Sequence, residues 1–522
     1  MVFSSSVFFM AFLPVTVFIY FLIPERFLRA RNLWLLAASL LFYGWGEPKY
    51  IAVMAFSIVF NYVFGRVIGH LRETADRETT LPAAEDNAKS LTGDRAGGDE
   101  NAAGQAYCAA DIAGNGNRKI LRRAKLAMVL CVIGNLAILG FFKYTDFLIG
   151  TVNGLLGGQL SLLHIALPIG ISFYTFQTMS YIIDVYWGKV AAQKDFIAFA
   201  AYVTLFPQLI AGPIVRYADV AVMLVGRKTN VEQIAEGIRR FIIGFGKKVL
   251  LANQVYVIWN EITAMDLEQI SFATAWLGAL AFTFQIYFDF SGYSDMAIGL
   301  GKIFGFDYLE NFNYPYISRS ITEFWRRWHM SLSSWFKEYV YVPLGGNRKG
   351  LARQLLNIAI VWALTGLWHG ASWNFVVWGI YFGVILIIEK LWLLRALDKC
   401  PAFVGHVYSL ILIVLGWVIF GLTDFSRMAT YIAHMFGGAA ALVDENFLYL
   451  ATSRVWLLIF CAIGSTPLVK CVCKRVAARL TAMRGGEALL GVLESAVLLA
   501  VFALSIAFLV SGSYNPFLYF RF

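Results

Sequence analysis

Long apolar runs recur along the whole chain and constrain its fold more than any other feature. About a dozen such runs lie near 7–24, 33–46, 49–69, 125–143, 165–187, 196–215, 238–259, 272–290, 353–370, 373–393, 405–423, 455–470 and 487–511. A helix needs about 20 apolar residues to cross a bilayer. Charged residues make up only 15% of the chain, against about 25% in soluble domains. The sequence therefore predicts an all-α polytopic membrane protein, with about 11–13 tilted transmembrane or re-entrant helices.

Several of these runs are interrupted by Gly and Pro, as in ALPIGISFY (166–174) and LFPQLIAGPIV (205–215). Non-helical backbone persists at membrane depth only where it is buried in protein or lines a cavity. We therefore expect re-entrant elements at both places. The first run, 7–24, is followed by charges instead of being preceded by them, which predicts a retained span and not a signal peptide.

The distribution of Lys and Arg predicts the orientation of the chain. Basic loops follow the first run, precede residue 125, and occupy 306–353, 389–399 and 470–484. Alternating spans place all of these loops on one side, which the positive-inside rule makes cytoplasmic. The C-terminus is then predicted to be extracytoplasmic. The formal charge of +10 thus reflects loops beside anionic lipid, and no nucleic-acid partner is expected.

Composition divides the chain into four predicted parts. Residues 1–70 form N-terminal transmembrane helices, and 125–395 form a core that holds the polar motifs. Residues 396–522 supply C-terminal transmembrane helices and an extracytoplasmic tail. Between the first two parts, 71–124 is rich in Ala, Gly, Asp, Glu and Asn. Such a composition buries little apolar surface, which predicts a disordered cytoplasmic insert.

Polar residues interrupt the aromatic run FTFQIYFDFSGYSDMAIG (282–299), namely Gln285, Asp289 and Asp295. An ionised aspartate at the bilayer centre costs about 3 kcal/mol, so such groups face a partner or a cavity. Two interpretations stay open, a structural hydrogen-bond network and a direct part in the chemistry.

The stretch 317–350 has the periodicity of an amphipathic helix lying in the membrane interface. Ser320 or Thr322 is suited to cap its start, and Trp325 and His329 share its aromatic stripe. A histidine on such a stripe is either a satisfied core group or an active-site residue.

A second histidine, His369, lies in LTGLWHGASWN (364–374), between Trp368 and Asn374 and within an apolar run. An ionisable residue inside the membrane indicates a functional site, and a neutral imidazole is what a general base requires. The alternative is a buried histidine that donates to a carbonyl. No cysteine or carboxylate stands at ligand spacing from the histidines, so no metal site is predicted.

Taken together, these motifs resemble the membrane-bound O-acyltransferase family. The resemblance is carried by SITEFWRRWHMSLSSWFKEYVYVPLGGNRKG and LTGLWHGASWNFVVWG. It is extended over most of the chain by QIYFDFSGYSDMAIGLG, LPIGISFYTFQTMSYIIDVY and LFPQLIAGPIVRY. It is closest to the membrane subunit of bacterial alginate O-acetyltransferase and to relatives that acetylate other exopolysaccharides or peptidoglycan. It says nothing of the insert.

The resemblance implies a ring of tilted helices around a thinned core with a tunnel, and acetyl-coenzyme A as a cytoplasmic co-substrate. It makes His369 the catalytic base, while His329 orients the thioester or donates to the oxyanion. The tunnel or substrate-binding residues implied are Gln285, Asp289, Asp295, Trp325, Arg326, Trp368 and Asn374. The basic residues around Arg326 lie where coenzyme A phosphates would arrive, or they face lipid.

The tail SGSYNPFLYFRF (511–522) resembles tails in which a tyrosine hydroxyl takes the acyl group. By this hypothesis Tyr519 relays the acetyl group to an extracytoplasmic SGNH-type acetyltransferase or a related accessory protein. Alternatively, Tyr519 anchors the tail in the interface with its aromatic neighbours.

We therefore predict acetyl transfer across a bacterial inner membrane, toward a polysaccharide acceptor that the chain contacts directly or through its partners. One alternative within the family is D-alanyl transfer to teichoic acid. Another is a non-enzymatic transporter, for which broken helices and intramembrane aspartates are also suited.

Overall fold

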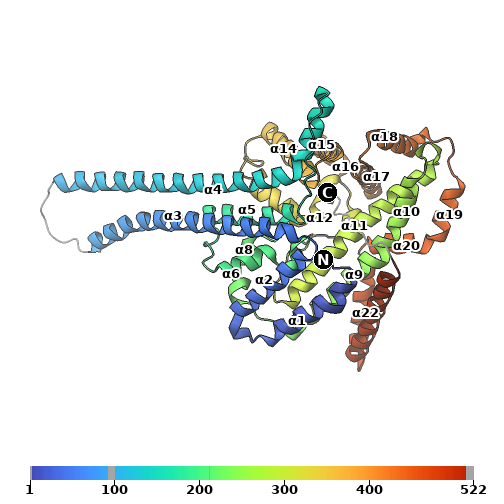
Figure 1. Cartoon of the computed structure of the whole chain (residues 1–522), viewed down its shortest axis with the longest axis horizontal. Helices are drawn as coiled ribbons and strands as arrows, with labels where there is room; N and C mark the ends of the chain where they lie inside the picture. Colours follow the sequence, from blue (N-terminus) through green and yellow to red (C-terminus); the bar gives the residue numbers. More distant parts are fainter. Residues whose placement is uncertain (1–2, 92–99, 211, 513–522) are drawn as a thin grey trace.

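The computed structural model describes residues 3–91, 100–210 and 212–512, which are helical and contain no β-strand. The first half holds α1 (Leu13–Leu22), α2 (Leu28–Gly44), α3 (Ile51–Leu91), α4 (Glu100–Leu156), α5 (Ile171–Trp187), α6 (Phe196–Thr204), α7 (Phe206–Leu209), α8 (Tyr217–Gly226), α9 (Val231–Gly246), the π-helical turn η4 (Lys247–Ala252), α10 (Asn253–Ala264) and α11 (Phe272–Ile303). The second half holds α12 (Ile321–Arg327), α13 (Met330–Phe336), the π-helical turn η7 (Lys337–Tyr341), α14 (Leu351–His369), α15 (Trp373–Ile388), α16 (Leu394–Leu397), α17 (Ala402–Gly421), α18 (Phe425–Ala433), α19 (Glu445–Ser453), α20 (Val455–Gly464), α21 (Leu468–Thr481) and α22 (Gly486–Ser511). Figure 1 shows their arrangement and confirms the all-α prediction.

Within the described residues, seven segments are long and apolar enough to cross a membrane, or up to nine if two bent helix pairs each count as one span. The chain is therefore a multi-pass membrane protein. The apolar runs predicted near 165–187 and 196–215 form the 17-residue α5 and the short α6 and α7. Apolar composition marks both lipid-facing and protein-buried segments, so it does not separate spans from short buried helices.

The long helix α11 runs through the middle of the body (Figure 1) and is buried along most of its length. At two places its backbone lies directly against the backbone of α9. A Cβ added at Gly237 or Gly244 of α9 would lie 2.6 Å from the carbonyl oxygen of Gly299 or Gly292 of α11, respectively. Small residues on facing helices permit this close approach, as is common in membrane proteins.

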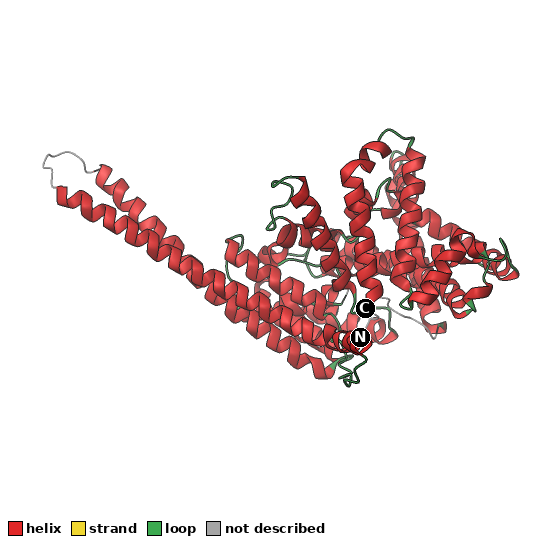
Figure 2. Cartoon of the chain, turned by 90° about the horizontal axis from the view of Figure 1, so that it is seen from above, coloured by secondary structure: helices red, strands yellow, loops and turns green. Residues whose placement is uncertain are grey.

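The helices α3 and α4 lie side by side and extend beyond the rest of the protein as a two-helix arm (Figures 1 and 2). The arm contains residues 71–91 and 100–124, so the predicted disorder of the 71–124 insert is wrong for these residues. The insert is rich in Ala and also holds Glu, Lys and Arg. These are strong helix formers, and their propensity offsets the scarcity of apolar residues.

Candidate active site

The segment that carries His329 is broken at the histidine itself. α12 ends before Trp328, and α13 begins after His329, whose φ of 44° lies in the left-handed region. The single helix predicted here is therefore wrong, although Ser320 caps α12 as predicted, accepting from the Glu323 N–H at 3.0 Å. A non-glycine residue in this conformation costs about 1–3 kcal/mol, so its surroundings have to hold it in place.

His329 points into the protein, as the aromatic stripe predicted. Its side chain is buried, with the Phe290 ring at 4.6 Å and the Trp368 ring at 5.8 Å between centroids. Its Nδ1 lies 3.1 Å from the Oδ1 of Asn311.

His369 is the last residue of α14 and is buried among aromatic rings. Its ring centroid lies 4.9 Å from that of Trp378, 5.0 Å from Trp368 and 5.4 Å from Phe420. The chain leaves the helix at Gly370 with extended backbone. Because a helix end leaves its last carbonyls without intrahelical partners, the position of His369 depends on what binds those carbonyls.

Two neighbouring side chains of α4 bind them. The Nζ of Lys143 donates to the carbonyl of Trp368, and the hydroxyl of Tyr144 donates to the carbonyl of Leu367 at 2.5 Å. Lys143 is buried. Sequence reasoning missed both residues, although a lysine in an apolar run is the kind of signal that marks an intramembrane functional residue.

Both histidines line one cavity of about 320 Å³, together with Trp325, Arg326 and Lys337. The rest of its wall is mostly apolar and includes Leu332, Phe336, Ile358, Val361, Trp362 and Leu386. The structure thus brings together two residues that lie 40 positions apart (369 − 329), and it places two cations beside them.

His369 also lines a second cavity, of about 70 Å³, with Lys143 and Trp368. Lys143 in turn lines a third, of about 500 Å³, with Gly370 and Ser372. His369 therefore lies between the cavity lined by Arg326 and Lys337 and the two cavities lined by Lys143. This arrangement offers a reacting group access from two directions.

The acidic residues of α11 are tied to its neighbours. Asp289 pairs with Lys248 at 2.5 Å, and Asp295 pairs with Lys247 at 2.6 Å and with Arg240 at 2.9 Å. These contacts favour the structural interpretation of both aspartates. Asp295 lines a separate polar cavity of about 530 Å³.

Two further predicted residues lie beside the site. Gln285 is buried within α11, and it is not among the described residues that line the three cavities around His369. Asn374 is buried and donates to the carbonyl of Phe420 at 3.0 Å, near the end of α17. Because Phe420 packs against His369, Asn374 supports the site without lining its cavities. Tyr519 lies outside the described residues.

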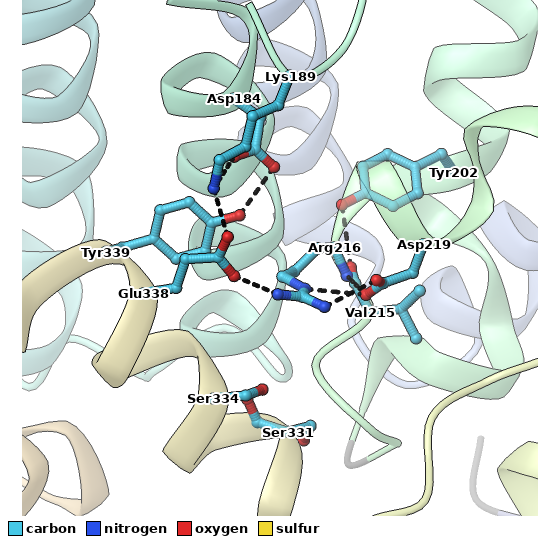
Figure 3. Close-up of polar contacts among 10 residues, drawn as sticks. All are labelled: Asp184, Lys189, Tyr202, Val215, Arg216, Asp219, Ser331, Ser334, Glu338 and Tyr339. Carbon is cyan, nitrogen blue, oxygen red and sulfur yellow. Dashed lines mark hydrogen bonds and ion pairs between the residues drawn. The ribbon is translucent and has the colours of Figure 1, made fainter. Parts of the chain in front are cut away.

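A group of charged residues holds η7, the turn that follows α13 in the segment that carries His329 (Figure 3). Glu338, in η7, contacts both Lys189, which follows α5, and Arg216, which precedes α8. Burial opposes ionisation of Glu338, but its contacts with Lys189 and Arg216 outweigh it and hold the pKa of Glu338 below its usual value. The ionised carboxylate thus joins three elements of the fold.

Neighbouring contacts extend this group. Tyr339 donates to Asp184 Oδ2 at 2.8 Å, and Arg216 pairs with Asp219 at 2.8 Å. The contacts fix η7, and with it the start of the loop that leads to α14.

Replacing Glu338 with glutamine is expected to lower the thermal stability of the protein in detergent. The carboxylate is about one-third exposed, so the loss should be about 1 kcal/mol. Since its folded pKa is depressed, its contribution is present above the unfolded pKa and is lost as pH falls through the folded pKa. Differential scanning fluorimetry should therefore show a melting difference at neutral pH that disappears in acid. The matched control is Glu261→Gln, at an exposed position; equal melting of Glu338→Gln and wild type at neutral pH would contradict the assignment.

Comparison with known proteins agrees with a multi-pass membrane protein. A sequence model of the membrane-bound O-acyltransferase family matches residues 191–428, which include both histidines. The probable alginate O-acetylase AlgI of Pseudomonas putida is 38% identical over 542 aligned positions that cover all of both chains. The protein of the same name from Pseudomonas aeruginosa is 42% identical, covering 80% of this chain and 72% of that one. The peptidoglycan O-acetyltransferase of Helicobacter pylori is 32% identical, covering 80% of this chain and 77% of that one. This chain is thus an acyltransferase of the membrane, and it belongs to the membrane-bound O-acyltransferase family.

Proposed function

We propose that the protein transfers an acetyl group from cytoplasmic acetyl-coenzyme A toward hydroxyl groups of an extracytoplasmic polysaccharide, in a bacterial inner membrane. The observation that carries the proposal is the cavity that holds both histidines and two cations. The relatives that cover most of this chain are named for O-acetylation of alginate or peptidoglycan, which supports acetyl as the group transferred.

The proposed chemistry places His369 as general base. The acceptor hydroxyl attacks the carbonyl carbon of the thioester while its proton passes to the imidazole. A C–O bond forms, the C–S bond breaks, and the proton returns to the departing thiolate. The products are an acetyl ester and a free thiol. The aromatic rings around His369 exclude water, which limits hydrolysis of the thioester.

The cavity also fits the donor. Arg326 and Lys337 line the cavity whose inner wall is apolar. Guanidinium and ammonium groups bind phosphates, and an apolar wall accommodates a thioester arm. The positive-inside rule predicts that these cations face the cytoplasm. The cavities beside Lys143 would then receive the acceptor.

A radiolabel experiment tests the proposal. The purified protein in nanodiscs is incubated with acetyl-labelled acetyl-coenzyme A, and release of free thiol and transfer of label are followed. Turnover that requires His369 supports the proposal. Turnover with a D-alanyl carrier thioester but not with acetyl-coenzyme A would replace the donor by that of the teichoic-acid systems. Absence of binding to either donor would overturn the proposed donor.

Replacing Tyr519 with phenylalanine tests the acyl relay in the same assay. The variant keeps the aromatic ring and loses the hydroxyl that would carry the ester. We expect label retained on the wild-type chain to fall to background in Tyr519→Phe, while binding of acetyl-coenzyme A is unchanged. Tyr514→Phe, in the same tail, is the matched control. Undiminished label on the Tyr519 variant would leave the tyrosine as an aromatic anchor.

A further inference from the structure

Asn311 contacts the residue at the break between α12 and α13 and the two residues after it. Its backbone carbonyl accepts from the N–H of Met330 at 3.0 Å. Its side-chain oxygen accepts from the N–H of Ser331 at 3.3 Å and from the hydroxyl of Ser331 at 2.9 Å. Its side-chain nitrogen donates to Ser294 Oγ on α11 at 2.9 Å. Asn311 thus satisfies the first N–H groups of α13 and is itself held by α11.

These contacts assign the tautomer of His329. A backbone N–H can only donate, so the Asn311 atom that faces Ser331 N–H has to be the amide oxygen. The same oxygen lies 3.1 Å from Nδ1 of His329. The hydroxyl of Ser331 also lies 3.5 Å from Nδ1, but its one hydrogen goes to the closer Asn311 oxygen at 2.9 Å. Nδ1 therefore carries the hydrogen that faces Asn311, and in a neutral imidazole Nε2 is then a bare acceptor. Among the described residues, Nε2 has no hydrogen-bond partner, and His329 lines the cavity that it shares with His369.

We propose that Asn311 is a positioning residue, which holds His329 in the Nδ1–H form so that Nε2 accepts a hydrogen bond from a substrate O–H or N–H group. The inference rests on the proposed function. A thioester carbonyl and its sulfur have no hydrogen to give, and the attacking hydroxyl gives its hydrogen to His369, so the partner of Nε2 is an amide of the donor's arm or a second hydroxyl of the acceptor. Neutral His329 accordingly does not donate to the oxyanion, and that charge is stabilised by other groups.

Other charged groups face His329 from two sides. His369, Arg326 and Lys337 line its cavity. Beyond Asn311 lies the polar cavity, lined by Arg240, Lys247, Asp295, Glu310 and Lys470. All of these groups are the same in wild type and in a variant at Asn311, so a change in the titration of His329 reports on Asn311 alone.

The decisive variant is Asn311→Asp. A carboxylate keeps an acceptor for Ser331 N–H and for His329 Nδ1–H, so the start of α13 stays capped. Its negative charge within hydrogen-bond distance favours the imidazolium, with a rise in pKa of about 1–3 units. An imidazolium has no lone pair on Nε2. The acid limb of the kcat/KM profile with acetyl-coenzyme A should therefore move to higher pH by about 1–3 units. A variant more active than wild type in acid would show His329 acting as a donor, and an unmoved limb would show that turnover does not need a bare Nε2; either result would overturn the proposal.

A second measurement does not depend on activity. ¹⁵N chemical shifts of ¹⁵N-histidine protein in nanodiscs, assigned by difference with His329→Gln, distinguish a protonated from a bare ring nitrogen. We expect a protonated Nδ1 and a bare Nε2 at neutral pH, and the reverse would refute the assignment. If wild type transfers no acetyl group, the proposed function fails while this measurement still decides the tautomer. Asn61→Asp, at another buried asparagine, is the control for a new buried carboxylate and should leave the acid limb in place.

Two small thioesters then identify the hydrogen that Nε2 accepts. S-acetyl-N-acetylcysteamine retains an amide, and S-ethyl thioacetate has none. If the acid limb of Asn311→Asp shifts with the first compound but not with the second, the hydrogen bond is assigned to the donor's amide. A shifted limb with both compounds assigns it to the second hydroxyl of the acceptor. Absence of a shift with both would overturn the proposal.

Discussion

Replacing His369 with glutamine is expected to lower the rate of acetyl transfer by about 10²–10⁴-fold, the usual contribution of a general base. Glutamine keeps a polar group of similar length but takes up no proton at neutral pH. His369 is buried at the end of α14 and lines two cavities, so bulk water is poorly placed to replace it. The loss should appear in kcat, because the imidazole assists the chemical step more than binding of the thioester. Single-turnover release of coenzyme A from the purified variant measures it.

The matched control is His434→Gln. His434 is also buried, and its Nδ1 lies 3.1 Å from the carbonyl oxygen of Ile270. It follows α18 and has no place in the three cavities around His369 that the structure describes. This control should retain near wild-type turnover. A folded His369→Gln variant with undiminished turnover would remove His369 from the chemistry.

Replacing Lys143 with methionine should reduce kcat by about 10- to 100-fold. Methionine keeps most of the apolar stem and removes the Nζ that donates to the carbonyl of Trp368. Leaving a buried acceptor unsatisfied costs about 1–3 kcal/mol. The end of α14 would relax, and with it the ring of His369. A displacement of about 1 Å at a reacting group is enough for losses of this size.

Two kinetic constants of Lys143→Met, kcat and KM, separate a loss of positioning of His369 from general damage to the fold. Lys125→Met changes an exposed lysine on the same helix and should have no effect. Tyr144→Phe, which removes only the hydroxyl on Leu367, should produce a smaller loss than Lys143→Met. We expect an unchanged KM for acetyl-coenzyme A in Lys143→Met and in Tyr144→Phe, since Arg326 and Lys337 are untouched. A Lys143→Met enzyme with wild-type kcat would show that α14 holds its end without the lysine.

The sequence predicts the class of protein and the two principal site residues because both depend on local properties. Apolar runs of the required length specify membrane helices wherever they occur. A histidine inside such a run, as at His369, is costly enough to indicate a function without any knowledge of its neighbours. The cap at Ser320 is likewise a local signal.

The break at His329 could not be predicted in the same way. Trp325, His329, Leu332 and Phe336 have the spacing of one continuous helix. The chain leaves that path because Asn311, which precedes α12 in sequence, supplies acceptors for the first N–H groups of α13. Contacts between distant segments thus override the local preference, and only the structure reveals them.

Lys143 shows a related limit. Its residue type and its apolar surroundings signal a special role, but its partner lies 225 residues further along the chain. A single sequence gives no indication of that pairing. The aspartates of α11 show the same limit. The sequence reveals the cost of placing them in the membrane, but it does not reveal which Lys and Arg residues of α9 and η4 pair with them.

Direct contact of backbone with backbone makes α9 and α11 a single rigid body. The four glycines at these contacts have no side chains of their own that could yield to a relative rotation or sliding of the two helices, namely Gly237, Gly244, Gly292 and Gly299. Because α11 also carries Ser294, the support of Asn311 is fixed to this body. Any widening that admits a substrate is then expected from the walls formed by α12, α13 and α14, at the boundary where Lys143 and Tyr144 of α4 bind the end of α14. Spectroscopic distance labels placed across that boundary should report motion during turnover, whereas a pair placed on α9 and α11 should remain at constant separation.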